Sequence, residues 1–271
     1  MPRYLAALVL LLGCGPEDSL SAAEEGPDMR SRASNVSMAR YTDVWMIAGQ
    51  SNASGKGSKP SLPTSPVNLQ NAQTDILYSQ TINGGSVLSL VALQPDGNSH
   101  GVEITFGRAL ADAGRRVGIL KWAYDGSGLE NTWLGGAQYY NTAKTFWQGE
   151  LASFPKPWRV RGLIWIHGES DGNNSGRADR YTTNLDTLAA NFRADFGANA
   201  IMLLNKLHVS AAVTYGTTVR ARQGTFVSAD AHASIIDGDD LALKADALHY
   251  ASADLQALGS RFASAALSLT P

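Results

Sequence analysis

Residues 43–52 read DVWMIAGQSN, a short apolar run that stops at a glycine. A run of this length that ends in glycine is typical of a strand buried on both faces of a sheet. Similar runs predict further strands at 76–82, 86–93, 116–123, 159–166, 201–207 and 234–237. The first two of these flank Asn83-Gly84-Gly85 and also fit a hairpin.

Helical patterns occupy the intervals between these runs, at 104–113, 137–154, 177–196, 217–227 and 252–267. Apolar strands that alternate with helices predict an α/β fold, with a central parallel sheet that helices cover on both faces. Ligands bind such sheets beyond the carboxyl ends of the strands. The segments that follow the predicted strands are therefore where chemistry is expected.

The composition excludes two classes of protein. The chain has 271 residues, a formal net charge of −2 and 44% hydrophobic residues. A nucleic-acid-coating protein would carry a large basic excess, so no nucleic-acid partner is expected. Wholesale disorder requires few apolar residues and a high net charge. Because no repeat or later linker interrupts it, the stretch 41–271 predicts one folded domain.

The N-terminal residues predict export. Arg3 precedes an apolar run of eight residues, Leu5 to Leu12, and a membrane span needs about 20. The run is therefore typical of a signal peptide. Gly13-Cys14 resembles the lipobox of bacterial lipoproteins, which predicts a signal peptide over 1–13 and a lipid anchor on Cys14. An ordinary signal peptide that is cut slightly later is the alternative.

Residues 14–40 are rich in Ser, Ala, Glu, Gly and Pro without apolar periodicity. This composition predicts a flexible tether. Together with the lipid anchor it predicts a lipoprotein held at a membrane, in the periplasm or at the cell surface. With a single cysteine the chain has no internal disulfide.

Ser51 directly follows the first predicted strand. A serine at a strand-to-helix turn can project its hydroxyl into the crevice at the sheet edge, while its own N–H lies at the positive end of a helix. The alternative is that Ser51 only caps a helix.

Residues 165–172 (WIHGESDG) contain a second serine, in a G-x-S-x-G pattern. That pattern needs a helix to begin behind the serine, whereas residues 172–176 (GNNSG) disfavour one. Ser170 is therefore not the expected nucleophile. His167, Glu169 and Asp171 alternate along one strand face, as metal ligands can. No second histidine stands at ligand spacing, so no metal is included among the expected site groups and a structural metal stays a minor alternative.

Asp246 precedes His249 by three residues, just before the last predicted helix. An aspartate at this spacing can accept the imidazole Nδ1–H and leave Nε2 free to deprotonate a hydroxyl. In α/β-hydrolases the acid and the histidine lie on separate loops. The spacing therefore argues against that fold.

Four ordered motifs across residues 41–267 together resemble the SGNH hydrolases, in particular the carbohydrate acetylesterase branch with a sialate O-acetylesterase-like domain. They are Gly49-Gln50-Ser51-Asn52, Gly101-Val102-Glu103 with Phe106, His167-Gly168-Glu169-Ser170-Asp171, and Asp246 with His249. The resemblance implies a flavodoxin-like, three-layer α/β/α sandwich with a parallel sheet.

The resemblance also implies a serine-esterase mechanism without a cofactor or metal. Ser51 is then the nucleophile, His249 the general base and acid, and Asp246 its orienting partner. The oxyanion hole consists of the backbone N–H groups of Ser51 and Gly101 and the side chain of His167. This branch usually has glutamine at position 167, and the wider superfamily has asparagine. A neutral imidazole can still donate one N–H.

Four further residues are expected to position the catalytic groups or the substrate: Gln50, Asn52, Glu103 and Glu169. Glu169 is also a second candidate to orient His249. The expected reaction is removal of O-acetyl groups from a carbohydrate, such as acetylated xylan or sialic acid. The alternatives are an esterase for longer acyl chains and a non-catalytic glycan-binding lipoprotein. Trp122 and Trp133 either belong to the core or stack on a sugar ring.

Overall fold

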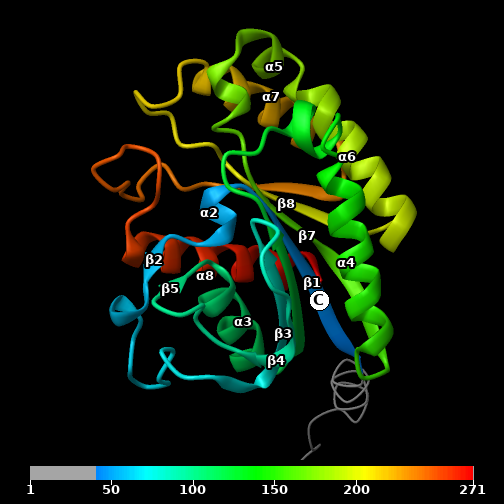
Figure 1. The fold of residues 1–271 in the computed structure, drawn as a ribbon, viewed down its shortest axis with the longest axis vertical. Coiled ribbons are helices and arrows are strands. Elements are labelled where there is room, and N and C mark those ends of the chain that lie inside the picture. The colour runs from blue at the N-terminus through cyan, green and yellow to red at the C-terminus, as the bar shows by residue number, and fades with distance from the viewer. Residues whose placement is uncertain (1–40, 271) are drawn as a thin grey trace, which may run out of the picture.

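The computed structural model describes residues 41–270, which are built around a seven-stranded sheet with the order β4-β3-β6-β1-β7-β8-β9 (Figure 1). Every neighbouring pair is parallel except β3 and β4, which are antiparallel at one edge. The strands are β1 (Thr42–Gly49), β3 (Gln73–Ile82), β4 (Leu88–Leu93), β6 (Arg116–Ala123), β7 (Trp158–Ile166), β8 (Ile201–Asn205) and β9 (Ala233–Ile236).

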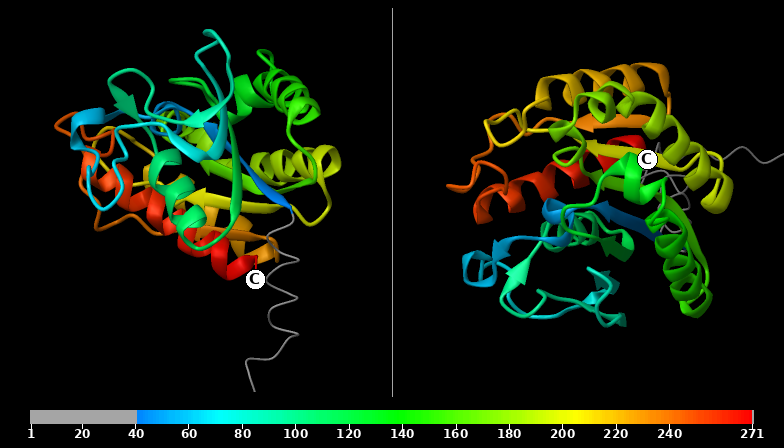
Figure 2. Two further views of the ribbon diagram at one scale, coloured as in Figure 1. Left: turned by 90° about the horizontal axis from the view of Figure 1, so that it is seen from below. Right: turned by 45° about the horizontal axis from the view of Figure 1, so that its top comes forward.

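Helices cover both faces of this sheet (Figures 1 and 2). One layer holds α3 (Glu103–Asp112) and α8 (Ser252–Leu269), and the other holds α4 (Tyr139–Ser153), α6 (Tyr181–Phe196) and α7 (Gly216–Ala229). The fold is therefore a three-layer α/β/α sandwich, as the sequence predicts.

The remaining elements are short. They are α2 (Ser51–Ser54), the antiparallel pair β2 (Gly57–Ser58) and β5 (Ser99–His100), the helical turns η1 (Lys59–Ser61), η2 (Leu129–Trp133) and η3 (Asp171–Asn173), and α5 (Ser175–Asp179). Most lie beyond the carboxyl ends of the strands, where they shape the site.

The central strand β1 is buried along its whole length. Because successive side chains of a strand point to opposite faces, β1 contributes to both layers of the core. Val44, Met46 and Ala48 pack toward α4 and α6, whereas Trp45 and Ile47 pack toward α3 and α8. This two-sided burial explains why the apolar run has no polar alternation.

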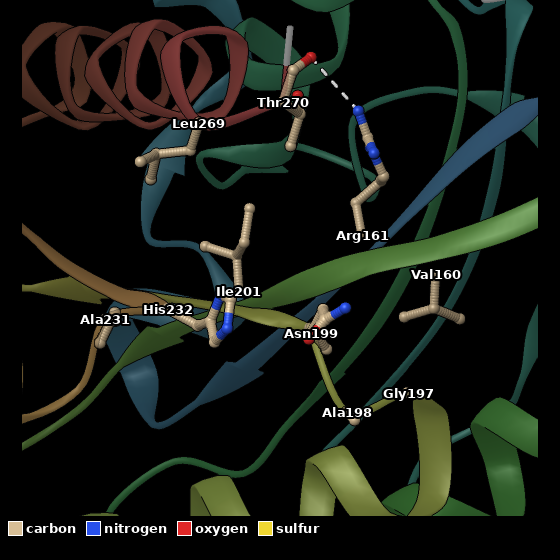
Figure 3. A pocket seen from close by; sticks show the side chains of 12 residues that line it. Val160, Arg161, Gly197, Ala198, Asn199, Ile201, Ala231, His232, Leu269 and Thr270 are labelled. Atoms are coloured by element: carbon tan, nitrogen blue, oxygen red, sulfur yellow. Dashed lines mark hydrogen bonds between the residues drawn. The ribbon is translucent and has the colours of Figure 1, made fainter.

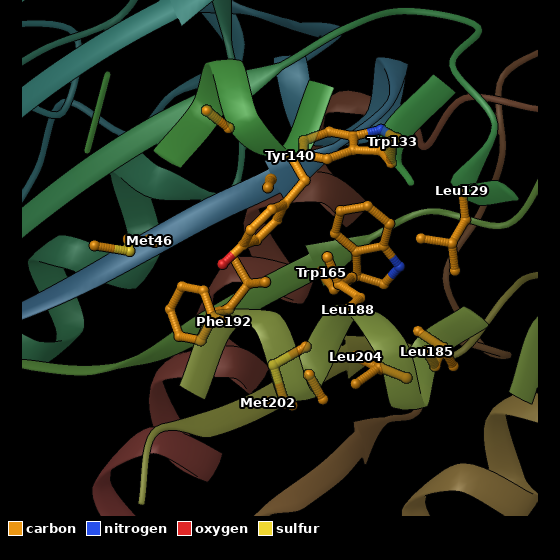
Figure 4. Packing of buried hydrophobic residues seen from close by; sticks show 14 of the residues in the cluster. Met46, Leu129, Trp133, Tyr140, Trp165, Leu185, Leu188, Phe192, Met202 and Leu204 are labelled. Carbon is orange, nitrogen blue, oxygen red and sulfur yellow. The ribbon is translucent and has the colours of Figure 1, made fainter. Parts of the chain in front are cut away.

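Trp122 and Trp133 belong to the core. Their side chains are 3% and 1% exposed. Trp133 packs edge-on against Trp122 and Trp165, with ring centroids 5.0 and 4.8 Å away, and Figure 4 shows it among the buried aliphatic residues. Neither indole is available to stack on a sugar, so the core interpretation is the correct one of the two.

The structure departs from the sequence expectations in short or edge elements. The helix expected over 177–196 is interrupted at Arg180, where α5 ends and α6 begins. The pair β2–β5, the turn η2 and helix α2 have too few residues to produce a periodic pattern.

The predicted signal peptide (1–13), the lipid anchor on Cys14 and the tether (14–40) lie outside the described residues. Within residues 41–270, no helix has both the length and the apolar character that a membrane crossing requires.

We expect Gly162→Ala to weaken the sheet. A Cβ at Gly162 would lie 2.2 Å from the backbone oxygen of Ile201, so strands β7 and β8 would have to move apart. Urea unfolding should show a loss of about 1–3 kcal/mol in the free energy of unfolding. The control Gly149→Ala, where nothing lies within 4 Å, should stabilise helix α4 by roughly 0.5–1 kcal/mol. Equal stability of Gly162→Ala and the wild type would contradict this account.

Candidate active site

A polar pocket of about 450 Å³ lies at the carboxyl ends of β1, β6 and β7. It is lined by Gln50, Ser51, Lys56, Asp125, Gly126, Glu169, Ser170, Asn173, Ala212, Leu248 and His249. The segments that follow three neighbouring strands therefore meet here, together with the loop that precedes α8. This is the sheet edge where ligands are expected in such folds.

Ser51 enters the pocket because the chain turns sharply after β1. Gly49 adopts a φ of +141°, and a Cβ there would lie 2.0 Å from the backbone oxygen of Ile166. Only glycine fits this turn. Ser51 then begins α2, so its N–H, in the first turn of the helix, has no partner within the helix.

The hydroxyl of Ser51 meets the imidazole of His249 across 198 positions of sequence. Their Oγ and Nε2 atoms lie 2.9 Å apart, and Nδ1 of His249 lies 2.8 Å from a carboxylate oxygen of Asp246. A carboxylate only accepts hydrogen bonds, so Nδ1 carries the proton and Nε2 is free to accept one from the serine. The predicted proximity of these three groups is present in the structure.

The turn that holds Asp246 and His249 is locally strained and locally hydrogen-bonded. Ala247 adopts a φ of 56°, a conformation that is unfavourable for a residue with a Cβ. The carboxylate of Asp246 accepts the N–H groups of Leu248 and His249, each at 2.9 Å. The N–H and the ring of His249, followed by the N–H of Leu248, lower the pKa of Asp246 to about 2. The carboxylate is therefore charged throughout the ordinary pH range.

Asn52 joins helix α2 to the loop that carries His249. Its side-chain amide donates to the carbonyl of Leu248 at 3.1 Å and to Glu169 at 2.8 Å, and its oxygen accepts the N–H of Tyr250 at 3.2 Å. These contacts hold the residues on both sides of His249. Asn52 thus holds the backbone beside His249, and its role in positioning the catalytic groups stays a prediction.

Glu169 and Gln50 connect helix α2 and the turn before it to the segment that follows β7. Burial raises the pKa of Glu169, whose carboxylate accepts from Asn52 and makes no hydrogen bond to His249. Asp246, not Glu169, is the residue that contacts the imidazole. The side-chain oxygen of Gln50 accepts the N–H of Ser170 at 3.2 Å. Ser170 lines the pocket, but among the described residues its hydroxyl has no histidine partner.

Glu103 lies beneath α2, outside the pocket. It accepts the N–H of Gly101 at 2.8 Å and forms a fully buried ion pair with Lys121 at 3.0 Å. Lys121 in turn donates to the carbonyl of Ser54, the last residue of α2, at 2.9 Å. Glu103 therefore positions the helix and not the substrate.

Two expected oxyanion donors need correction. The N–H of Gly101 is already committed to Glu103, so it does not face the pocket. His167 is 1% exposed, and its ring nitrogens lie 2.9 Å from the carbonyl oxygen of Ser127 and 3.1 Å from the hydroxyl of Tyr181. Since both nitrogens have protein partners, the ring has no donor left for a substrate.

The pocket wall includes six residues that were not predicted from the sequence: Lys56, Asp125, Gly126, Asn173, Ala212 and Leu248. Lys56 and Asp125 form an ion pair at 2.5 Å. Burial acts to raise the pKa of Asp125, but hydrogen bonds from Lys56 and Ser54 outweigh it and the pKa is lowered. Asp125 and Gly126 directly follow the end of β6, so the rule that singled out Ser51 could also have found them.

A second pocket, of about 570 Å³, lies at the opposite ends of β7, β8 and β9. Figure 3 shows its lining, where Arg161 donates to the carbonyl of Thr270. Its lining residues include no serine, so no serine–histidine pair faces it. Among the described residues, no group of three His, Cys, Asp or Glu side chains is arranged to hold a metal ion. The polar pocket around Ser51 is the candidate active site.

A model of the family described as "Carbohydrate esterase, sialic acid-specific acetylesterase" matches residues 41–268. A comparison with curated proteins finds no significant match.

Several solved structures share the fold. A protein from Arabidopsis thaliana superposes with a TM-score of 0.66 at 19% identity, covering 84% of this chain and 98% of that one. The structure of NanS superposes with a TM-score of 0.63 at 14% identity, covering 84% of this chain and 97% of that one. A carbohydrate acetylesterase from Xanthomonas citri gives 0.59 at 21% identity, covering 84% of this chain and 56% of that one. At these identities the likeness concerns the fold.

We expect His167 to make the protein sensitive to acid. Burial lowers its pKa from 6.5 to about 4, so between these values the unfolded chain binds a proton that the folded chain does not. The free energy of unfolding therefore falls as the pH drops through this window, and His167 contributes up to about 3 kcal/mol of that loss. Urea unfolding of the wild type and of His167→Gln at pH 7 and 4.5 measures the difference. The same loss in both proteins would contradict this assignment.

Proposed function

Because the chain belongs to the sialic acid-specific acetylesterase family of carbohydrate esterases, we propose that it removes O-acetyl groups from a carbohydrate with Ser51, His249 and Asp246 as its catalytic triad. The family makes the chain a carboxylic ester hydrolase that acts on carbohydrates. The observation that supports the triad is the unbroken chain of contacts from Ser51 Oγ to His249 at 2.9 Å and on to Asp246 at 2.8 Å.

In the first half of the reaction, Ser51 Oγ attacks the acetyl carbonyl carbon and its proton passes to Nε2 of His249. The bond between that carbon and the sugar oxygen then breaks, and His249 gives its proton to the departing sugar. In the second half, His249 deprotonates a water, which attacks the acetyl-serine. The bond between the acetyl carbon and Ser51 Oγ then breaks, Oγ takes the proton back from His249, and acetate leaves. Asp246 holds Nδ1–H throughout and stabilises the imidazolium.

The oxyanion of each tetrahedral intermediate needs donors that face it, and losing one typically lowers the rate about 10²–10³-fold. The N–H of Ser51, in the first turn of α2, is one donor. Gly126 supplies the second candidate: it is exposed, it lines the pocket, and its N–H makes no hydrogen bond within residues 41–270. Both are backbone groups, so the side chain at position 167 is not itself a donor in this oxyanion hole.

The pocket wall favours a hydroxyl-rich leaving group. The ion pair of Lys56 with Asp125 and the side chains of Ser170 and Asn173 border the serine. These groups can donate to and accept from sugar hydroxyls. An esterase for long acyl chains would instead need an extended apolar lining. The wall therefore supports an acetylated carbohydrate over the longer-acyl alternative.

The location of the enzyme belongs to the same proposal. The expected signal peptide and the lipid anchor on Cys14 would place it outside the cytoplasm, tethered to a membrane. There it would meet extracellular acetylated glycans, with xylan and sialic acid as the two substrates to compare.

Ser51→Ala should abolish esterase activity, with kcat falling by about 10⁴-fold or more because no nucleophile remains. A fluorophosphonate probe should label the wild type on Ser51, as mapped by mass spectrometry of the digest, and should not label the variant. The surface variant Ser264→Ala should keep both activity and labelling. An adduct on Ser170, or none at all, would contradict the assignment.

Acyl preference tests the substrate proposal. With p-nitrophenyl esters, activity should be greatest on acetate and should fade beyond butyrate, because the wall offers polar groups instead of an apolar channel. Acetate release from acetylated xylan and from O-acetylated sialic acid then ranks the glycans. Activity that increases with chain length would support the longer-acyl esterase instead.

A further inference from the structure

His167 lies directly after β7, inside the protein and beside the catalytic pocket. Its ring stacks with Trp165 at 4.8 Å between centroids and with Tyr181 at 6.2 Å, with interplanar angles of 20° and 17°. This stack fixes the ring plane, and with it the directions of both nitrogens. Nε2 points to the carbonyl oxygen of Ser127 and Nδ1 to the hydroxyl of Tyr181.

The partners of the two nitrogens determine where the proton resides. A carbonyl oxygen only accepts hydrogen bonds, so Nε2 of His167 must donate to Ser127. A neutral imidazole has one N–H, and burial keeps the pKa of His167 at about 4. Nδ1 therefore carries no proton. It lies 3.1 Å from the hydroxyl of Tyr181, whose single hydrogen is shared between Nδ1 and the backbone carbonyl oxygen of His167, also 3.1 Å away.

Ser127 is the fixed point of the loop that carries the pocket wall after β6. Its carbonyl accepts from His167, and its hydroxyl accepts the indole N–H of Trp133 at 2.9 Å. Two residues after Ser127, the N–H of Leu129 donates to the buried carboxylate of Asp171 at 2.7 Å. Gly126 immediately precedes Ser127 and is exposed in the pocket. Buried contacts thus hold the loop from Ser127 onward, while Gly126 is exposed in the pocket that Ser51 also lines.

We propose that His167 is a positioning residue for the esterase: its Nε2–H holds the carbonyl of Ser127 and so orients the peptide groups around Gly126 that border the reacting ester. The inference rests on the proposed function, because those peptide groups matter to the rate only where an oxyanion develops. It also reverses the role that the resemblance implies, in which the side chain at 167 is itself a donor to the oxyanion. His167 acts on the reaction through the backbone.

A matched pair of variants tests this role. The amide nitrogen of a glutamine reaches about as far as Nε2 of histidine, whereas that of an asparagine reaches about as far as Nδ1. His167→Gln should therefore keep the contact with Ser127, and His167→Asn should lose it. On an acetyl ester we expect His167→Asn to lower kcat by about 10–100-fold, since small misplacement of catalytic groups has effects of this size. KM should stay within about threefold, and His167→Gln should stay within about threefold of the wild type in both constants.

Different outcomes overturn the proposal in different ways. Wild-type kcat in His167→Asn, or a rise in KM alone, would remove the positioning role. Equal losses in both variants would mean that the ring stack matters and not the N–H. Full activity in Ser51→Ala would overturn the proposed function itself, independently of both variants at 167.

A measurement on the wild type covers the case in which a variant does not fold. Nitrogen-15 NMR of labelled histidine should show the His167 ring protonated on Nε2 and bare on Nδ1 at neutral pH. The opposite tautomer would overturn the proposal.

Trp133→Phe, which removes the second contact to Ser127, should also lower kcat without raising KM. An unchanged kcat in this variant would count against a role for Ser127 as the fixed point.

Discussion

The turn at Gly49 is the constraint on which the site depends. A Cβ at this position would collide with the backbone of Ile166, so the chain passes from β1 into α2 only because the residue is glycine. The turn places Ser51 at the carboxyl end of β1, in the pocket, and leaves Asn52 buried behind it. Asn52 then holds the loop of His249. The close contact between Gly49 and the backbone of Ile166 thereby helps to bring Ser51, near the start of the domain, to His249, near its end.

Buried polar groups then hold this arrangement rigid. The ion pair of Glu103 and Lys121 supports the carbonyl at the end of α2, and Asn52 and Glu169 join α2 to the segment after β7. A buried ion pair adds little net stability, because desolvation offsets its attraction. What these contacts contribute is orientation. Pre-oriented donors and nucleophiles lower a reaction barrier because no reorganisation is left for the transition state.

Much of the fold and part of the site could be predicted. The strands of the sheet and its main helices follow from apolar runs and helical periodicity, and their ends agree to within a few residues. Asp246 and His249 contact each other through local spacing. The roles of Gly101 and His167 could not be predicted, because they depend on which acceptor each N–H finds. Ser127 lies 40 positions from His167 and is set by packing. Glu103 belongs to the same motif as Gly101, but the motif does not show that its carboxylate takes the N–H of Gly101.

The sequence by itself determined the layered α/β architecture and the strand ends at which the candidate serine and the pocket residues lie. Period and spacing are local properties, so they can be seen in a single chain. Only the tertiary structure decided that Ser51 reaches His249, that Asp125 and Gly126 share their pocket, and that His167 turns away from it. Each of these depends on the direction of a side chain or peptide group within a packed interior. That direction is determined by neighbours that lie far away in the sequence.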